Sequence, residues 1–342
     1  MKIPGSRTLK RIFYPFNRLG IILMYHRVAD LNYDPMSLNV SPRHLEEQMQ
    51  VLKKHGHPVK MQSIGKDLKR FSMGKMGIAV TLDDGYTDNF YNAKPIFERA
   101  DVPATFFIIS GSIDSQEEFL WDGLKSTILA PETLPQIFEI TVIDKKYRWV
   151  IEPSGPCQSV DYSQSLPGIP SNNIKLSRFQ LYEALLQILG ALSAEQKRSV
   201  LKDLAQWSGQ ALTVRKDYLP MNSTDLKSLA SCQLFEIGAH TVNHPRLASL
   251  PVQKQKEELS QSKGDLENRL NKAIISFSYP YGSYSEETVK LVELLKFQNA
   301  CTVVPNPVMP DTNPYLLPRF AVKDWNGDEF EKNLLNWLGQ IS

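Results

Sequence analysis

The sequence is poor in cysteine and has no long apolar run. Three of its 342 residues are cysteines; they lie far apart, and no two have the CxxC spacing. Neither a disulfide framework nor a cysteine metal site is therefore expected. We expect the protein to reside in a reducing compartment. No segment reaches the ~18 consecutive apolar residues of a membrane-spanning helix, so we expect a cytoplasmic chain.

The charges are nearly balanced. Lysine and arginine total 39, aspartate and glutamate total 37, and the formal net charge is +2. A chain that binds nucleic acid usually carries a clear basic excess, so no nucleic-acid partner is expected. Hydrophobic residues make up 42% of the chain, as in a globular protein with a buried core. No internal repeat and no low-complexity tract is visible.

Residues 1–19 form a basic arm without a single acidic residue, and they include three aromatic residues. The apolar core and small-residue cleavage site of a signal peptide do not follow this basic stretch. We expect a solvated arm. The alternative is a segment that lies on an anionic membrane surface, which would give the protein a peripheral membrane association.

Strand-like and helix-like segments alternate over most of the chain. Ser41 before Pro42 is typical of a helix start and Gly56 of a helix end, which predicts a helix at residues 42–55. Further helices are expected at 92–100, 251–272, 285–297 and 328–338. Short apolar runs predict buried strands at 20–28, 77–82, 103–110, 234–239, 274–278, 299–304 and 317–322. Such alternation implies a parallel sheet, either open or closed into a barrel.

Residues 118–217 interrupt this alternation. A hairpin is expected at 139–151 with its turn at 144–146, followed by a loop rich in proline, serine and glycine and by two helices. The chain is therefore expected to consist of the arm at 1–19, a first core part at 20–117, an insertion at 118–217 and a second core part at 218–342.

The first polar cluster is TLDDGY at residues 81–86. Asp83 and Asp84 directly follow a buried strand, where two carboxylates are costly unless something uses or neutralises them. Neighbouring side chains of an extended segment diverge, so one carboxylate can ligate a metal while the other faces a reacting water. The alternative is a plain turn, which Asp-Asp-Gly also suits.

The second cluster is GAHTVNHP at residues 238–245. His240 and His244 follow the end of a strand, and their spacing of four residues allows both to bind one ion. Pro245 disfavours a helix at His244. Together with Asp84 they supply two nitrogens and one oxygen. Such a set holds a divalent metal, zinc in particular, and leaves a position open for water. The alternative is two surface histidines at a strand end.

The third cluster is SFSYPYGSY at residues 276–284. Pro280 and Tyr281 come at the end of a strand and could form one side of a binding site. The alternative is a rigid turn stabilised by aromatic packing.

In their order along the chain, TLDDGY, HTVNHP and YPYG resemble the three leading motifs of the polysaccharide deacetylases, the NodB-homology carbohydrate esterases. The resemblance covers residues 20–112 and 218–325. It implies an α/β fold, an irregular (β/α) barrel with an incomplete strand count, to which the mainly helical insertion is added. It also implies a zinc-type metal and the removal of an N-acetyl group from a sugar in a polysaccharide or glycoconjugate. By this resemblance Asp83 is the general base, and Asp84 is a metal ligand with His240 and His244.

The chain departs from the family pattern at two places. Ser278 stands where the family has an arginine that orients the base, and no histidine follows His244 to serve as the family's acid. Arg319 could reach Asp83 instead, or it could be an ordinary strand-edge arginine. We predict that His26, at the end of the first strand, is the acid. Exported poly-N-acetylglucosamine deacetylases carry a similar Tyr-His, and the alternative is a core histidine.

Further expectations concern the substrate. A backbone N–H near Tyr281 is expected to help hold the oxyanion. Trp121 in the insertion is expected nearest the substrate, with the insertion acting as a lid or side wall; the alternative is a core anchor of the insertion. Two other functions remain open from sequence, a deacylase or deformylase of a lipid-linked sugar and a non-catalytic carbohydrate-binding protein.

Overall fold

The computed structural model describes residues 20–64, 76–160, 168–190 and 192–339. Contacts divide the chain into two compact units. Unit 1 contains the described parts of Met1–Asp30, Leu38–Asp114 and Met221–Ser342, and unit 2 contains Leu31–Ser37 and Ser115–Pro220. The basic arm at 1–19 lies outside the described residues, so the expectation of a solvated arm and its alternative, contact with a membrane surface, both stay predictions. None of the described helices is long and apolar enough to cross a membrane.

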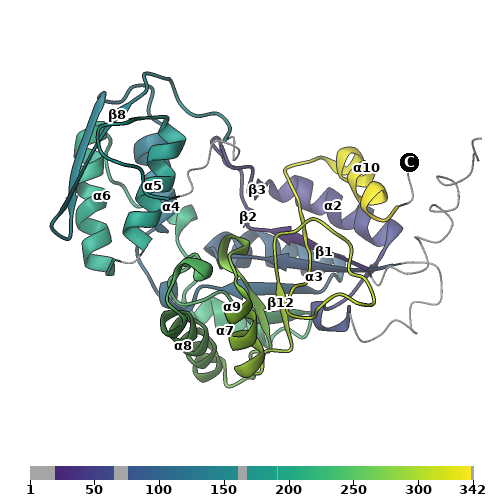
Figure 1. Cartoon of the computed structure of the whole chain (residues 1–342). Helices are drawn as coiled ribbons and strands as arrows, with labels where there is room; N and C mark the ends of the chain where they lie inside the picture. The colour runs from purple at the N-terminus through teal and green to yellow at the C-terminus, as the bar shows by residue number, and fades with distance from the viewer. Residues whose placement is uncertain (1–19, 65–75, 161–167, 191, 340–342) are drawn as a thin grey trace, which may run out of the picture. The chain divides into compact units, whose positions relative to one another are not determined.

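Unit 1 is built on a parallel sheet of eight strands (Figure 1). Their order is β12-β11-β10-β6-β5-β1-β13, and β4 pairs with β5 outside this path. The strands are β1 (Gly20–Tyr25), β4 (His57–Pro58), β5 (Gly77–Leu82), β6 (Ala104–Ile108), β10 (Phe235–Ala239), β11 (Ser276–Ser278), β12 (Asn299–Cys301) and β13 (Phe320–Ala321).

The two ends of this strand order are connected by backbone hydrogen bonds. The Leu317 N–H donates to the carbonyl of Ala300, and the Thr302 N–H donates to the carbonyl of Leu317, both at 2.8 Å. The segment that enters β13 therefore pairs with β12, while β13 itself pairs with β1. The expected fold, an irregular (β/α) barrel with an incomplete strand count, is confirmed.

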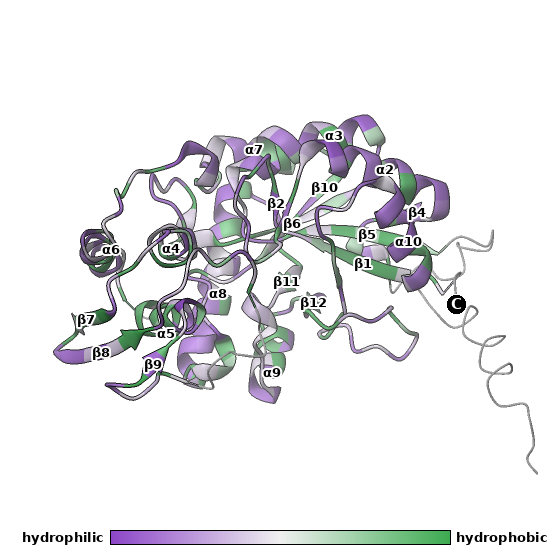
Figure 2. Ribbon diagram, turned by 90° about the horizontal axis from the view of Figure 1, so that it is seen from above, coloured by the Kyte–Doolittle hydropathy of each residue, from purple (hydrophilic) through white to green (hydrophobic). Residues whose placement is uncertain are grey.

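Helices cover the outside of the sheet. Figure 2 shows α7, α3 and α2 along one side of β10, β6, β5 and β1. The helices of unit 1 are α2 (Pro42–His55), α3 (Lys94–Ala100), α7 (Ser223–Ser231), α8 (Val252–Leu270), α9 (Glu286–Leu294) and α10 (Gly327–Trp337). The predicted start of α2 is confirmed, because the Ser41 side chain accepts from the His44 N–H and Pro42 opens the helix, which ends before Gly56.

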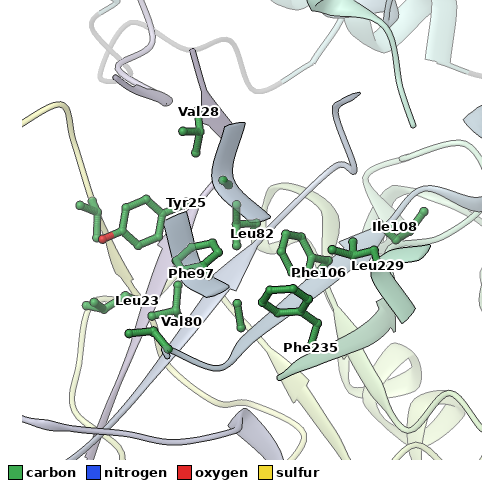
Figure 3. Packing of buried hydrophobic residues seen from close by; sticks show 14 of the residues in the cluster. Leu23, Tyr25, Val28, Val80, Leu82, Phe97, Phe106, Ile108, Leu229 and Phe235 are labelled. Carbon is green, nitrogen blue, oxygen red and sulfur yellow. The ribbon is translucent and has the colours of Figure 1, made fainter. Parts of the chain in front are cut away.

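The main core lies between these helices and the sheet (Figure 3). Phe97 of α3 is fully buried and meets Phe106 of β6 and Phe235 of β10 edge-on, with ring centroids 6.3 and 6.5 Å apart. Since β1, β5 and β6 are buried along their whole length, they read in the sequence as continuous apolar runs and not as alternating ones.

Unit 2 has a core of its own around the fully buried Trp149. It contains α4 (Leu120–Leu124), β7 (Ile137–Val142), β8 (Lys145–Ile151), β9 (Lys175–Leu176), α5 (Arg178–Gly190) and α6 (Ala194–Ser208), with a π-helical turn η5 (Lys125–Leu129) and a 3₁₀ turn η7 (Lys216–Tyr218). The expected hairpin and both expected helices are confirmed. The expected hairpin turn at 144–146 is wrong, because Ile143 and Asp144 make the turn with φ of 44° and 60°.

Other expectations differ in detail. The apolar run at 20–28 is two strands, because the chain leaves β1 at His26 and then forms β2 (Arg27–Val28), which pairs with β3 (Asn39–Val40). The expected helix at 92–100 begins earlier, as a π-helical turn η3 (Asn89–Ala93) that leads into α3. Helix α7 was not predicted, although Asn222 caps it by accepting from the N–H groups of Thr224 and Asp225. The remaining short turns of unit 1 are η1 (Met61–Ser63), η4 (Ser110–Ser112), η8 (Leu247–Ser249) and η9 (Pro280–Gly282).

Candidate active site

The polar clusters meet at the carboxyl-terminal ends of the strands, as is usual for active sites of parallel α/β sheets. Tyr25 of β1 pairs with Leu82 of β5, so the next residues, His26 and Asp83, leave neighbouring strands at the same level. The Asp83 N–H donates to the carbonyl of Tyr25 at 3.0 Å. The structure thus brings His26 beside the carboxylate pair, as the order of the strands predicted.

Asp84, His240 and His244 form a compact group of three possible ligands. The Nε2 atoms of His240 and His244 are 3.2 Å apart, and each lies 3.5 Å from Oδ1 of Asp84. Ligands bound tetrahedrally to one zinc ion at ~2.0–2.1 Å would lie ~3.3 Å from one another. The three side chains therefore fit a single small divalent metal without rearrangement.

The tautomer of His240 supports the same fit. Its Nδ1 lies 2.8 Å from the backbone carbonyl of Ser278, which can only accept, so Nδ1 carries the proton. The lone pair of Nε2 then points toward Asp84 Oδ1, and both atoms are acceptors. A cation is the partner that such a pair needs, and a histidine whose other nitrogen donates to a carbonyl is typical of a metal ligand.

Local charges keep the group in its ligating form. Burial lowers the pKa of His244 to about 3, against the opposing effect of the Asp84 charge, so the imidazole is neutral. Burial raises the pKa of Asp84, but the neighbouring imidazoles of His240, His244 and His26 favour the ionised carboxylate and leave its pKa below the ordinary value. Neutral imidazole and ionised carboxylate are the forms that bind a metal.

The backbone around these residues is unusual. Asp84, Thr241, His244 and Tyr281 all have positive φ, at 75°, 64°, 58° and 56°. Residues other than glycine rarely adopt this conformation, and such residues cluster at active sites, where the surrounding structure holds them in place. The positive φ of His244 also agrees with the expectation that Pro245 keeps this histidine in a loop.

Asp83 is held by Arg319. The two guanidinium Nη atoms lie 2.7 Å from the two carboxylate oxygens of Asp83, and Ser278 Oγ donates to Oδ2 at 3.2 Å. Arg319 is fully buried, and it also donates to Ser278 Oγ, Thr81 Oγ1 and the carbonyl of Thr302. It precedes β13, whereas Ser278 ends β11. Of the two alternatives for Arg319, the structure shows the one in which it reaches Asp83.

The contact with Arg319 keeps Asp83 ionised. Burial raises the pKa of Asp83, but the charge and hydrogen bonds of Arg319 outweigh the effect of burial and leave the pKa below its ordinary value. His240 Nε2 is 4.0 Å from Asp83 Oδ2, farther than it is from Asp84. Asp83 therefore lies next to the three possible ligands without belonging to their group.

The third cluster forms one border of the site. The centroids of the Tyr281 and His244 rings lie 4.5 Å apart. Tyr281 is 38% exposed, while Pro280 is buried. The guanidinium of Arg246 lies over the Tyr281 ring at 4.4 Å. Trp121 belongs to unit 2, where it stacks on Phe119 at 4.6 Å. Its expected place near a substrate stays a prediction.

Several residues that support the site were not predicted from the sequence. Asn89 Nδ2 donates to the carbonyl of His26 at 2.8 Å, and Asp88 accepts from the Val28 N–H and pairs with the buried Arg27. These contacts fasten the chain after β1 to the turn after β5. The only signal in the sequence was a pair of polar residues, Asp88 and Asn89, shortly after the two aspartates.

Comparisons with known proteins show which family and which fold this chain resembles. The family model described as "Polysaccharide deacetylase" matches residues 70–136 and 209–300. The protein named "Putative polysaccharide deacetylase YxkH" from Bacillus subtilis (strain 168) is 22% identical over 304 residues, which cover 88% of this chain and 70% of that protein.

Two solved structures show the same fold. The Streptococcus pyogenes deacetylase PplD in complex with acetate is 17% identical with a TM-score of 0.54, and the match covers 93% of this chain and 97% of that one. IcaB from Ammonifex degensii is 16% identical with a TM-score of 0.56, and the match covers 95% of this chain and 98% of that one.

Proposed function

We propose that this chain, which belongs to the polysaccharide deacetylase family, removes an N-acetyl group from a sugar in a polysaccharide or glycoconjugate. The observation that carries the proposal is the grouping of Asp84, His240 and His244 next to an ionised Asp83 at the strand ends. The solved S. pyogenes relative is described as a deacetylase in complex with acetate, the product that such a reaction releases.

Asp84, His240 and His244 would hold one divalent metal, and zinc suits two imidazoles and a carboxylate. When bound there, a zinc ion polarises the acetyl carbonyl and lowers the pKa of a water. Three protein ligands leave room for a further partner, which is the pattern of catalytic sites and not of closed structural ones.

Asp83 would act as the general base. Its carboxylate is ionised and fixed by Arg319 and Ser278, so it cannot turn away from the site. Oδ2 accepts from both Arg319 and Ser278, whereas Oδ1 accepts from Arg319 alone in the described hydrogen bonds, so Oδ1 keeps a lone pair that can accept the proton of the attacking water. The bidentate contact orients the base and leaves its function intact.

His26 would act as the general acid. It leaves β1 beside Asp83, and its backbone carbonyl is held by Asn89. As the C–N bond breaks, the departing amine takes a proton from the imidazolium, and acetate and a free amino sugar result. Tyr281, next to His244, would border the substrate and could offer its backbone N–H to the developing negative charge.

The test is an acetate-release screen on N-acetylated polymers, N-acetylated oligosaccharides and lipid-linked sugars, with the metal content measured in parallel. The proposal expects acetate from at least one N-acetyl sugar and its loss in Asp83→Asn. Release of formate or a longer acid instead would favour the alternative acyl group. Metal binding with no acid released from any acyl sugar would favour a non-catalytic carbohydrate-binding protein.

A further inference from the structure

The loop between the two histidines of the site is strained at both ends. Thr241 and His244 have φ of 64° and 58°, and neither is a glycine. A loop in this conformation persists only if contacts outside it hold it there. Its position matters, because it sets where the His244 imidazole lies relative to His240 and Asp84.

Part of the support comes from η4, the turn that follows β6. The Ser110 N–H donates to the carbonyl of Thr241 at 3.0 Å, and the Gly111 N–H donates to the carbonyl of Val242 at 3.1 Å. Within the loop, Thr241 Oγ1 accepts from the His244 N–H at 3.0 Å. These bonds satisfy two carbonyls of the loop and leave the N–H groups of its middle residues to another partner.

That partner is Glu258 on α8. One carboxylate oxygen, Oε2, accepts from the N–H groups of Val242 and Asn243 at 2.8 and 2.9 Å. The other, Oε1, accepts from the side-chain amide of Asn243 at 2.7 Å. Hydrogen bonds to an ionised acceptor are short and about twice as strong as neutral ones. A single carboxylate thus accepts from both backbone N–H groups in the middle of the loop and from the Asn243 side chain.

We propose that Glu258 is a positioning residue that fixes the loop between His240 and His244 and thereby sets the affinity of the site for its metal. The inference rests on the three ligands of the proposed function. Glu258 reaches the site only through the loop backbone and touches none of the three ligand side chains in the described hydrogen bonds. Residues that orient metal ligands in this way typically contribute ~10- to 100-fold in metal affinity.

The test compares Glu258→Gln with Glu257→Gln. Glutamine has the same size as glutamate, but it carries no charge and directs an NH₂ group toward an N–H or NH₂ donor of the loop. Glu257 is the preceding residue on α8, and its carboxylate pairs with Lys254 at 2.7 Å, within the same helix. The control therefore removes the same charge from the same helix without touching the loop.

Two quantities are measured on the full chain. Zinc affinity is obtained by competition with a chelator, and amide hydrogen exchange at Val242 and Asn243 is followed in the metal-free protein. We expect Glu258→Gln to bind zinc ~10- to 100-fold more weakly and to exchange faster at both amides. Glu257→Gln should match the unsubstituted chain in both. Asn243→Ala removes only the side-chain bond of the three, and its zinc affinity and exchange rates should lie between those of the two glutamine variants.

The outcomes are distinguishable. Zinc affinities of Glu258→Gln and Glu257→Gln within twofold of each other would overturn the positioning role while leaving the proposed function standing. Faster amide exchange without weaker zinc binding would show that Glu258 only stabilises the loop, and would overturn it too. If the unsubstituted chain binds no zinc, the three-ligand assignment fails, and the inference fails with it.

Discussion

Arg319 shows that a guanidinium can reach Asp83 from a different segment of the chain than the family pattern indicates. The family pattern places the arginine that orients the base at the position of Ser278, yet here the guanidinium reaches Asp83 from the segment before β13. Ser278 hydrogen-bonds to both residues, donating to Asp83 and accepting from Arg319. The sequence suggested Arg319 as one of two alternatives, but only packing in three dimensions shows that strands so far apart in the sequence share one carboxylate.

We predict that Arg319→Lys lowers kcat by ~10- to 100-fold while the metal content is unchanged. Lysine keeps a positive charge but cannot make the two parallel hydrogen bonds that fix the plane of Asp83. The measurement is steady-state kinetics with metal analysis. Arg43→Lys, at an exposed helix pair with Glu47, is the matched control and should behave like the unsubstituted chain. Full activity of Arg319→Lys would show that Asp83 needs no such orientation.

The substitution His26→Gln tests whether His26 is the general acid. The expected result is a fall in kcat of ~100-fold or more with the metal retained, because the departing amine then lacks its proton donor. Activity of this variant should recover in part on an acetyl ester, because the leaving alkoxide depends less on protonation than a leaving amine does. Turnover close to normal on a sugar amide would mean that another group donates the proton, and that His26 only packs beside Asp83.

At the scale of elements, the site depends on how the helices fix the strands. The sequence predicted the buried strands and the capped helices because continuous apolar runs, Ser41 and Gly56 are strong local signals. It did not predict the break at His26, where the backbone leaves β1 to pair with β3 through β2, because that pairing depends on residues that follow later. The contact of Asn89 with the His26 carbonyl was not predicted either, because it joins residues far apart in the sequence.

Phe97 joins α3 to the sheet that carries the site. We predict that Phe97→Ala lowers the free energy of unfolding by ~3–5 kcal/mol, since a fully buried ring that meets Phe106 and Phe235 leaves a cavity. Urea denaturation measures the change. Glu98→Ala, at the next position, is the control: its side chain is 38% exposed and pairs with Lys94 one turn away, so the free energy should change by less than ~0.5 kcal/mol. Equal losses in both variants would contradict the role given to the ring.

At the scale of the whole molecule, the chain combines two units with separate cores. The sequence predicted that residues 118–217 depart from the alternation, but it did not indicate that Leu31–Ser37 belongs with them. In unit 2, Tyr33 donates to the carbonyl of Cys157 at 2.8 Å, a contact between residues far apart in the sequence that no local pattern reveals.

Substitution of Trp121 distinguishes two interpretations of unit 2. In one the unit selects the substrate through Trp121, and in the other Trp121 only anchors the core of the unit. If unit 2 selects the substrate, Trp121→Ala should raise KM several-fold on the preferred sugar with little change in the melting temperature. If Trp121 is a core anchor that stacks on Phe119, the same substitution should lower stability and leave KM unchanged. Kinetics and thermal unfolding of the one variant decide between them. Trp207→Ala, also in unit 2, serves as the comparison, because its ring packs against Phe138 in that unit's core.

The central claim is that Asp84, His240 and His244 hold a metal and that Asp83 acts beside it. Zinc content per chain, measured by elemental analysis on the purified protein, on His240→Ala and on Asp83→Asn, tests it most directly. We predict about one zinc per chain in the unsubstituted protein and in Asp83→Asn, and almost none in His240→Ala. Equal zinc in His240→Ala and in the unsubstituted protein, or its loss in Asp83→Asn, would contradict the assignment.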